Sequence, residues 1–159
     1  GDYEIAFKEY ELLAEQGNAK AQSNLGRLYG RGHGVILDYK MAMKWFLLAA
    51  EQGYAGAQNS LGVMYAAGQG VQQDYKKAVK WYQMAAEQGY ADAQFNLGLK
   101  YPTGQGVPQD YKMAHMYYNI SGANGFDIGS ENRKMISAEM TPQQIEEAQE
   151  MAHEWMTNH

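Results

Sequence analysis

The chain has 159 residues, is 45% hydrophobic and carries a formal net charge of −5. These values suffice for a folded core, but the acidic balance disfavours nucleic acid, which normally selects a basic surface. The absence of cysteine excludes disulfides and thiolate metal sites, and no apolar run approaches the roughly 18 residues of a membrane span, so we expect no membrane insertion.

The chain opens with half of a repeat. The segment DYEIA at 2–6 aligns with DYKMA at 38–42, so residues 2–17 are interpreted as the second half of a repeat in an excised fragment. The location is therefore left open, and a periplasmic or secreted location follows if the parent protein carries a signal peptide. The first helix, near Asp2, has no capping element and is expected to stack on another repeat, a second copy of the chain or a missing segment.

Residues 41–76 and 77–112 are two copies of one 36-residue sequence. The same phase extends in both directions, because glycines recur 36 residues apart at Gly17, Gly53, Gly89 and Gly125. A period of this length indicates a repeat architecture in which each repeat packs on its neighbours. We therefore expect one domain, 1–159, with repeats at 18–53, 54–89 and 90–125 and an atypical repeat with a capping helix at 126–159.

Each repeat is predicted to contain two helices joined by a glycine turn. The second helix begins at an aspartate suited to the N-cap, and it ends at a glycine suited to a left-handed backbone. The aspartates are Asp38, Asp74 and Asp110, and the glycines are Gly17, Gly53 and Gly89. The intervening G-x-G-V segment lacks the third glycine of a dinucleotide loop and the Lys-Ser/Thr pair of a phosphate loop, so it predicts a turn and no nucleotide site.

Apolar residues follow helical spacing in both helices. Ala42, Trp45, Phe46 and Ala49 form an i, i+3, i+4, i+7 stripe that recurs one repeat later, and we expect it to be core. Glycine recurs in mid-helix at 26, 62 and 98, where it costs about 1 kcal/mol relative to alanine. Its repetition predicts a close approach between helices.

The final segment has the strongest helix start of the chain. Thr141 is suited to the N-cap, Pro142 to the first helical position and Gln144 to a capping box. A stripe of buried residues follows, with acidic side chains on the other faces, as a capping helix requires. The stripe is Ile145, Ala148, Ala152 and Trp155.

The repeat resembles the SEL-one-like repeat family, which is related to the tetratricopeptide repeat. The resemblance rests on A-A-E-Q-G, A-Q-x-x-L-G-x-x-Y and G-x-G-V-x-x-D, as in AAEQGYAGAQNSLGVMYAAGQGVQQDYKKAVKWY at 49–82, and it covers roughly residues 2–126. It implies an all-α fold, a right-handed α/α superhelical solenoid of antiparallel helix pairs. It also implies an adaptor for protein complexes, with bacterial envelope and host-interaction proteins among the members.

Comparison of the repeats with one another separates scaffold positions from variable ones. By analogy with tetratricopeptide repeats, the variable stripe of the first helix lines a concave groove, basic and polar near the N-terminus and apolar further along. Asn24 and Asn96 precede Leu-Gly and could hold a peptide backbone or form a scaffold hydrogen bond. The groove candidates are Lys20, Ser23, Asn24, Arg27, Arg31, Asn59, Val63, Asp92, Phe95, Asn96 and Leu99.

Phe95 and Leu99 form an apolar pair where other repeats place polar residues or arginine. One alternative is that they pack against the atypical last repeat. The other is that they anchor an apolar side chain of a partner, in which case Phe95→Ala weakens binding and leaves the melting temperature nearly intact. Pro102 lies just beyond this pair and predicts an early end to the third repeat's first helix.

The sequence contains few candidate catalytic residues. The four histidines are scattered, and no metal-ligand spacing, G-x-S-x-G or S-x-x-K motif is present. We therefore expect no enzyme, no cofactor and no metal, and we predict a protein–protein interaction module that binds a peptide or protein segment. The alternatives are an envelope module for glycan or peptidoglycan, and a regulatory domain of a larger protein.

Overall fold

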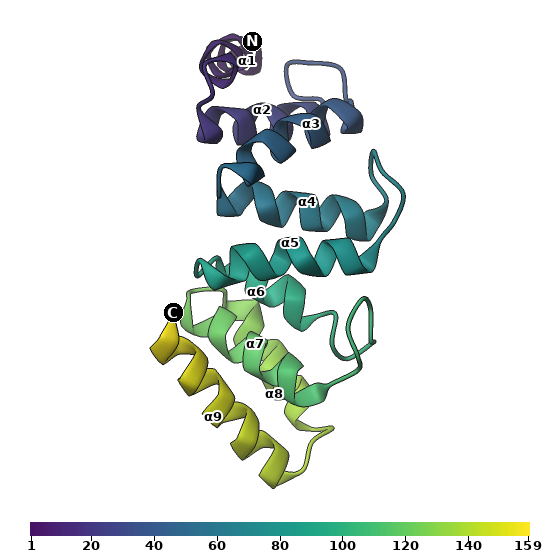
Figure 1. The fold of residues 1–159 in the computed structure, drawn as a ribbon, viewed down its shortest axis with the longest axis vertical. Coiled ribbons are helices and arrows are strands. Elements are labelled where there is room, and N and C mark those ends of the chain that lie inside the picture. The colour runs from purple at the N-terminus through teal and green to yellow at the C-terminus, as the bar shows by residue number, and fades with distance from the viewer. The chain divides into compact units, whose positions relative to one another are not determined.

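The computed structural model describes residues 1–159 and contains nine α-helices and no strand (Figure 1). The chain divides into two compact units, residues 1–74 and 75–159, here called the N-terminal and C-terminal units. The N-terminal unit holds α1 (Asp2–Glu15), α2 (Ala19–Arg31), α3 (Tyr39–Glu51) and α4 (Ala55–Ala67). The C-terminal unit holds α5 (Tyr75–Glu87), α6 (Ala91–Gly98), α7 (Tyr111–Ala123), α8 (Asp127–Ser137) and α9 (Pro142–Asn158). None of these helices has the length and apolarity to cross a lipid bilayer.

In the N-terminal unit each helix packs on its neighbours in sequence: α1 on α2, α2 on α3, and α3 on α4. Ala14, Ala21 and Leu25 form a buried cluster at the first of these contacts. Aromatic side chains close over the cluster, and they come from α1, α2 and α3. Three successive helices thus share one core, which is how an all-α repeat buries faces that no single repeat can cover.

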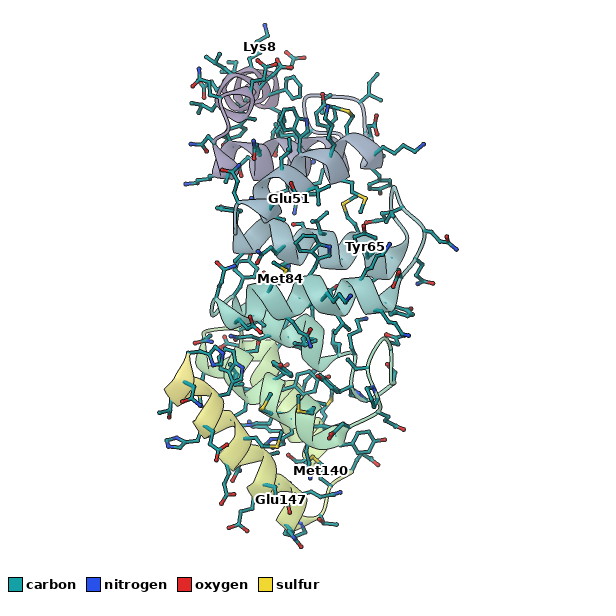
Figure 2. The ribbon with its side chains drawn as sticks, in the orientation of Figure 1. Lys8, Glu51, Tyr65, Met84, Met140 and Glu147 are labelled. Atoms are coloured by element: carbon teal, nitrogen blue, oxygen red, sulfur yellow. The ribbon has the colours of Figure 1, made fainter.

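In the C-terminal unit α6 packs on α5, α7 on α6, and both α8 and α9 on α7. The predicted start of α9 is confirmed: the Thr141 hydroxyl accepts from the Gln144 N–H at 3.2 Å, and the Gln144 side chain accepts from the Thr141 N–H at 2.9 Å. Lys112 Nζ on α7 also lies 2.9 Å from a carboxylate oxygen of Glu147 on α9, which is labelled in Figure 2. Of the predicted buried stripe, Ala148 and Ala152 are fully buried against α7, whereas Ile145 and Trp155 are only partly buried.

The predicted helix boundaries are confirmed where the contacts are described. Asp38 accepts from the N–H groups of Lys40 and Met41 at 2.9 and 3.0 Å, and Asp110 makes the matching bonds at the start of α7. Gly53 follows α3 with φ +86°, the left-handed value predicted for that position. Beyond α6, Pro102 has the expected effect, because α6 spans eight residues whereas α4 spans 13.

The second glycine of each G-x-G turn touches the backbone of another repeat. A Cβ at Gly70 (φ +70°) would lie 2.7 Å from the Tyr39 carbonyl oxygen, and one at Gly106 (φ +78°) would lie 2.5 Å from the Tyr75 carbonyl oxygen. The sequence predicted the left-handed backbone at these positions but not the contact. The turn of one repeat therefore rests on the start of the preceding repeat's second helix, where no side chain fits.

Two of the glycines predicted in mid-helix confirm the close approach of helices: Gly26 lies within α2, whereas Gly98 is the last residue of α6. A Cβ at Gly26 would lie 2.9 Å from the Phe46 ring, and one at Gly98 would lie 2.8 Å from the Tyr118 ring. The tryptophan stripe needs one correction. Trp45 is only partly buried and packs at the edge of the α1–α2 cluster, whereas its neighbour Phe46 is 5% exposed and fills the interior.

A buried glutamine joins successive helices in every repeat. The side-chain amides of Gln22, Gln58 and Gln94 donate to the carbonyl oxygens of residues eight positions earlier, at 3.1 to 3.2 Å. Gln94 also accepts from the Asn124 side chain at 2.9 Å. The A-Q pair of the repeat therefore fixes the start of one helix to the end of the preceding helix.

We expect Gln94→Met to lower the free energy of unfolding by about 1–2 kcal/mol, because two hydrogen bonds are lost without opening a large cavity. The Ala86 carbonyl keeps one partner, the Gly89 N–H at 2.9 Å, which limits the loss. Gln109→Met is the matched control, since its amide also donates to a carbonyl, that of Pro102, but in solvent. Urea denaturation should show a lower free energy of unfolding for Gln94→Met only. Equal losses in the two variants would contradict a structural role for Gln94.

Candidate binding groove

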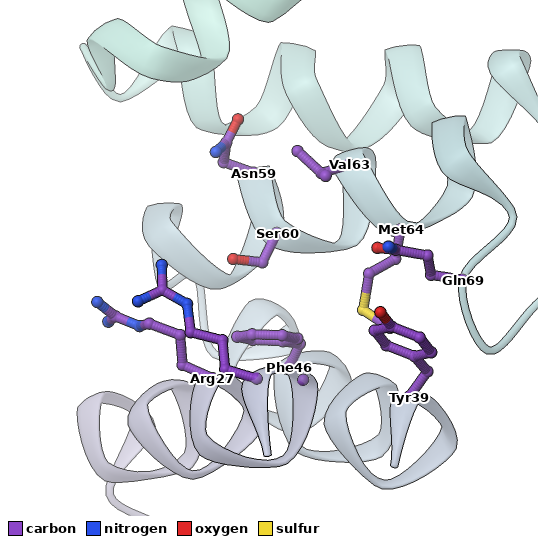
Figure 3. A pocket seen from close by; sticks show the side chains of 10 residues that line it. Arg27, Tyr39, Phe46, Asn59, Ser60, Val63, Met64 and Gln69 are labelled. Carbon is purple, nitrogen blue, oxygen red and sulfur yellow. The ribbon is translucent and has the colours of Figure 1, made fainter. Parts of the chain in front are cut away.

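The largest share of the predicted groove residues lies around two hollows in the N-terminal unit. The first hollow, of about 180 Å³, lies between α2, α3 and α4. Figure 3 shows Arg27 at one end, Tyr39 and Gln69 at the other, and Phe46 between them. The lining residues are Arg27, Gly30, Arg31, Tyr39, Phe46, Asn59, Ser60, Val63, Met64 and Gln69.

The second hollow, of about 220 Å³, lies between α1, α2 and the turn that follows α2. Tyr3 and His33 both line it, and their rings lie tilted against each other with centroids 4.6 Å apart. Arg27 and Arg31 line both hollows and so form the wall between them. We call the two hollows together the N-terminal groove.

Four predicted residues line the first hollow and one more lines the second. Arg27, Arg31, Asn59 and Val63 all line the first hollow. Asn24 lines the second hollow, where its side-chain oxygen accepts from the Arg27 guanidinium at 3.0 Å. Asn24 therefore holds Arg27 in place from one turn earlier on the same helix.

Two predicted residues of α2 line neither hollow. Ser23 is 2% exposed and cannot contact a partner, which corrects its assignment to the groove. At 3.6 residues per turn Ser23 lies about 40° around the helix from Arg27, which turns it toward the core. Lys20 is exposed at the start of α2 but lines neither hollow.

The apolar part of the predicted groove belongs to the C-terminal unit. Phe95 on α6 has two ring neighbours there, Phe126 at 4.9 Å and Tyr118 at 5.8 Å between centroids. This arrangement supports the alternative in which Phe95 packs against the atypical last repeat. Leu99 remains exposed, while Asp92 and Asn96 are partly buried.

Comparison with known proteins identifies the repeat. Three consecutive Sel1 repeats match residues 19–54, 55–90 and 91–126. The chain belongs to the Sel1 repeat family. Sel1 repeats are generally protein–protein interaction modules built on a typically non-catalytic scaffold. The sequence has no significant match among curated proteins.

Solved structures of bacterial Sel1 relatives share the fold. A Sel1 repeat protein from Oxalobacter formigenes is 38% identical with a TM-score of 0.72, covering 76% of this chain and 49% of that one. A protective antigen present in uropathogenic Escherichia coli strains, which displays an SLR fold, is 29% identical with a TM-score of 0.74, covering 95% of this chain and 40% of its own. The chain thus spans about half the length of these relatives or less.

Cysteine-rich protein B of Helicobacter pylori shares the fold at 22% identity. Its TM-score is 0.65, and the match covers 82% of this chain and 93% of that one. These likenesses place the chain among all-α helical repeat solenoids.

Sequence reasoning missed the groove residues that the Sel1 repeat also uses as scaffold. Tyr39 and Phe46 come from α3, whereas the groove residues were predicted only from the first helix of each repeat. Tyr39 recurs one repeat later at Tyr75 and again at Tyr111, so a comparison that keeps only variable positions discards it. Ser60 lines the same hollow while its hydroxyl donates to the Gly56 carbonyl at 2.9 Å.

The histidine and acidic side chains of this Sel1 chain form no metal-binding cluster. No three His, Asp or Glu side chains lie close enough together to hold a metal ion. His115 on α7 is 1% exposed and its Nδ1 has no hydrogen-bond partner. Burial, and to a smaller extent the nearby Arg133 guanidinium, lowers the pKa of His115 below its usual 6.5.

We expect His115 to make the fold sensitive to acid. The unfolded chain binds a proton at His115 near pH 6.5, whereas the native chain binds it only at lower pH. The unfolded state therefore binds more protons below about pH 6.5, and the free energy of unfolding falls as the pH drops through that range. Urea denaturation between pH 7 and 5 should show this fall, and His115→Leu should reduce its slope; an unchanged slope would contradict it.

Proposed function

We propose that this Sel1 repeat chain is a non-catalytic adaptor that binds a peptide or protein segment in the N-terminal groove. The observation that carries the proposal is that Arg27, Arg31 and Val63 occupy variable repeat positions and line one hollow. Residues that vary between copies are not needed for stacking the repeats, so their side chains are free to contact a partner.

The composition of the groove suits a protein segment. Phe46, Val63 and Met64 give the first hollow an apolar floor, and Val63 is 40% exposed. Arg27 on α2, and Asn59 and Ser60 on α4, add polar groups to the lining of the same hollow. Apolar floors with a few placed polar groups are typical of binding sites, in which the apolar contacts supply affinity and the polar groups supply orientation.

The test places a charge on the floor of the groove. Val63→Asp should release proteins that the wild-type chain captures from source cells. Met84→Asp is the matched control, because Met84 is exposed to a similar degree on α5, outside the groove. Capture that survives Val63→Asp, together with co-sedimentation of the chain with peptidoglycan, would favour the glycan-binding alternative. The full-length gene decides whether the chain regulates a larger protein.

We infer a second contact surface on α1. Ile5 and Leu12 are 62% and 60% exposed on this helix, and Leu13 beside them is also exposed. Such a face suits self-association of the chain or a docking protein. Sedimentation velocity should show a concentration-dependent dimer that Leu12→Glu removes, and a wild-type monomer at all concentrations would contradict self-association.

A further inference from the structure

We propose that the N-terminal groove binds an acidic segment, with carboxylates on Arg27 and Arg31 and an apolar side chain in each hollow. This inference rests on the proposed function and adds the chemistry of the partner. It follows from the charges that line the groove, from the position of the two arginines, and from the hollows on either side of them.

The groove is free of acidic side chains in an acidic protein. The chain has 18 Asp and Glu residues against 13 Lys and Arg. None of the residues that line either hollow is Asp or Glu, and both linings include Arg27 and Arg31. The groove is therefore a local site of positive charge, and a ligand of opposite charge is complementary to it.

The two guanidinium groups are placed to bind carboxylates. Arg27 and Arg31 are four residues apart on α2, so they lie on one helix face with Cβ atoms roughly 5–6 Å apart. Both are exposed, and neither forms an ion pair within the chain, since Arg27 bonds the neutral side chain of Asn24. A guanidinium donates two parallel hydrogen bonds to a carboxylate, which gives the contact both strength and orientation.

The repeat fold does not need these arginines. The positions that match Arg27 one and two repeats later hold Val63 and Leu99, and those that match Arg31 hold alanine and threonine. Helix α4, which holds Val63 and Ala67 at these positions, forms in the same architecture. The two arginines thus occur in one copy only, at positions that line its groove, and the repeat scaffold does not account for them.

The hollows on both sides give the segment its apolar contacts. The first has Phe46, Val63 and Met64, and the second has Tyr3 and Tyr10. A cavity of about 150 Å³ admits a benzene-sized ring, and the hollows measure about 180 and 220 Å³. A segment that crosses the arginine wall can therefore place one aliphatic or aromatic side chain in each hollow.

The experiment is a selection from a phage-displayed library of random peptides on the whole chain. The wild-type chain should enrich peptides in which Asp or Glu is flanked by Phe, Tyr or Leu. The variant Arg27→Val with Arg31→Ala introduces residues that the chain itself uses one repeat later, so it should fold normally. It should lose this enrichment, whereas Lys76→Ala with Lys80→Ala, which removes two exposed charges from α5, should retain it.

Fluorescence anisotropy of an enriched peptide completes the test. Its affinity should fall with added salt and should fall roughly tenfold or more in the arginine double variant, because each lost charged hydrogen bond contributes strongly. If the wild-type chain enriches uncharged peptides and Val63→Asp abolishes that enrichment, the groove is still the binding site, but its preference for acidic segments is overturned. No enrichment at all, or enrichment indifferent to both Val63→Asp and the arginine variant, would overturn the inference and the proposed function together.

Discussion

Gly70→Ala should lower the free energy of unfolding by about 3 kcal/mol, one of the largest single effects we expect in this chain. Two causes add. The backbone at Gly70 has φ +70°, which strains any side chain, and a Cβ there would lie 2.7 Å from the Tyr39 carbonyl oxygen and 3.0 Å from the Tyr39 Cβ. Because a backbone atom cannot rotate away, the turn must lift off the start of α3.

Gly53→Ala separates the two causes. Gly53 has a similar φ of +86°, but a Cβ there would meet nothing within 4 Å. Its expected loss is about 1–2 kcal/mol, from left-handed strain alone. Urea denaturation of both variants measures the difference. Equal losses would show that the contact between the turn and Tyr39 contributes nothing.

Phe95→Ala should lower the free energy of unfolding by about 2 kcal/mol and leave partner binding in the N-terminal groove unchanged. The ring lies against Phe126 and Tyr118, and its removal opens a cavity between α6, α7 and the start of α8. A fully buried phenylalanine would cost about 3–5 kcal/mol, and the partial exposure of Phe95 reduces that value.

Leu99→Ala is the control for Phe95→Ala, because Leu99 lies one turn further along and is exposed. Its expected loss is below about 1 kcal/mol. Thermal denaturation of the two variants, with peptide affinity measured in parallel, checks both statements. If Phe95→Ala melts at the wild-type temperature but binds the partner weakly, Phe95 contacts the partner and its assignment to the core is wrong.

The fold was predictable because the 36-residue period repeats every local signal several times. Asp110, Gly53 and Pro102 each act through backbone chemistry that depends on one or two neighbouring residues. The resulting N-cap, left-handed turn and early helix end are therefore visible in the sequence. Thr141 is a further case, with its capping box complete in the structure.

The candidate site was predictable only in part, because its remaining members depend on distant contacts. A helical stripe identified Arg27 and Val63, but the same stripe included Ser23. Ser23 lies slightly further around α2 than Arg27, on the side that faces the core, and is therefore buried. Tyr39 and Phe46 enter the groove from α3, and only the packing of α3 between α2 and α4 brings them there. Internal comparison could not separate such residues from scaffold, since they serve both purposes.

Amide hydrogen exchange of the whole chain, with and without an enriched acidic peptide, tests the central claim most directly. We expect slower exchange in α2 and α4 and in the turn after α2, which line the N-terminal groove, with no change in α9. The arginine double variant should show no such protection at the same peptide concentration. Protection confined to α9, or equal protection in the double variant, would contradict it.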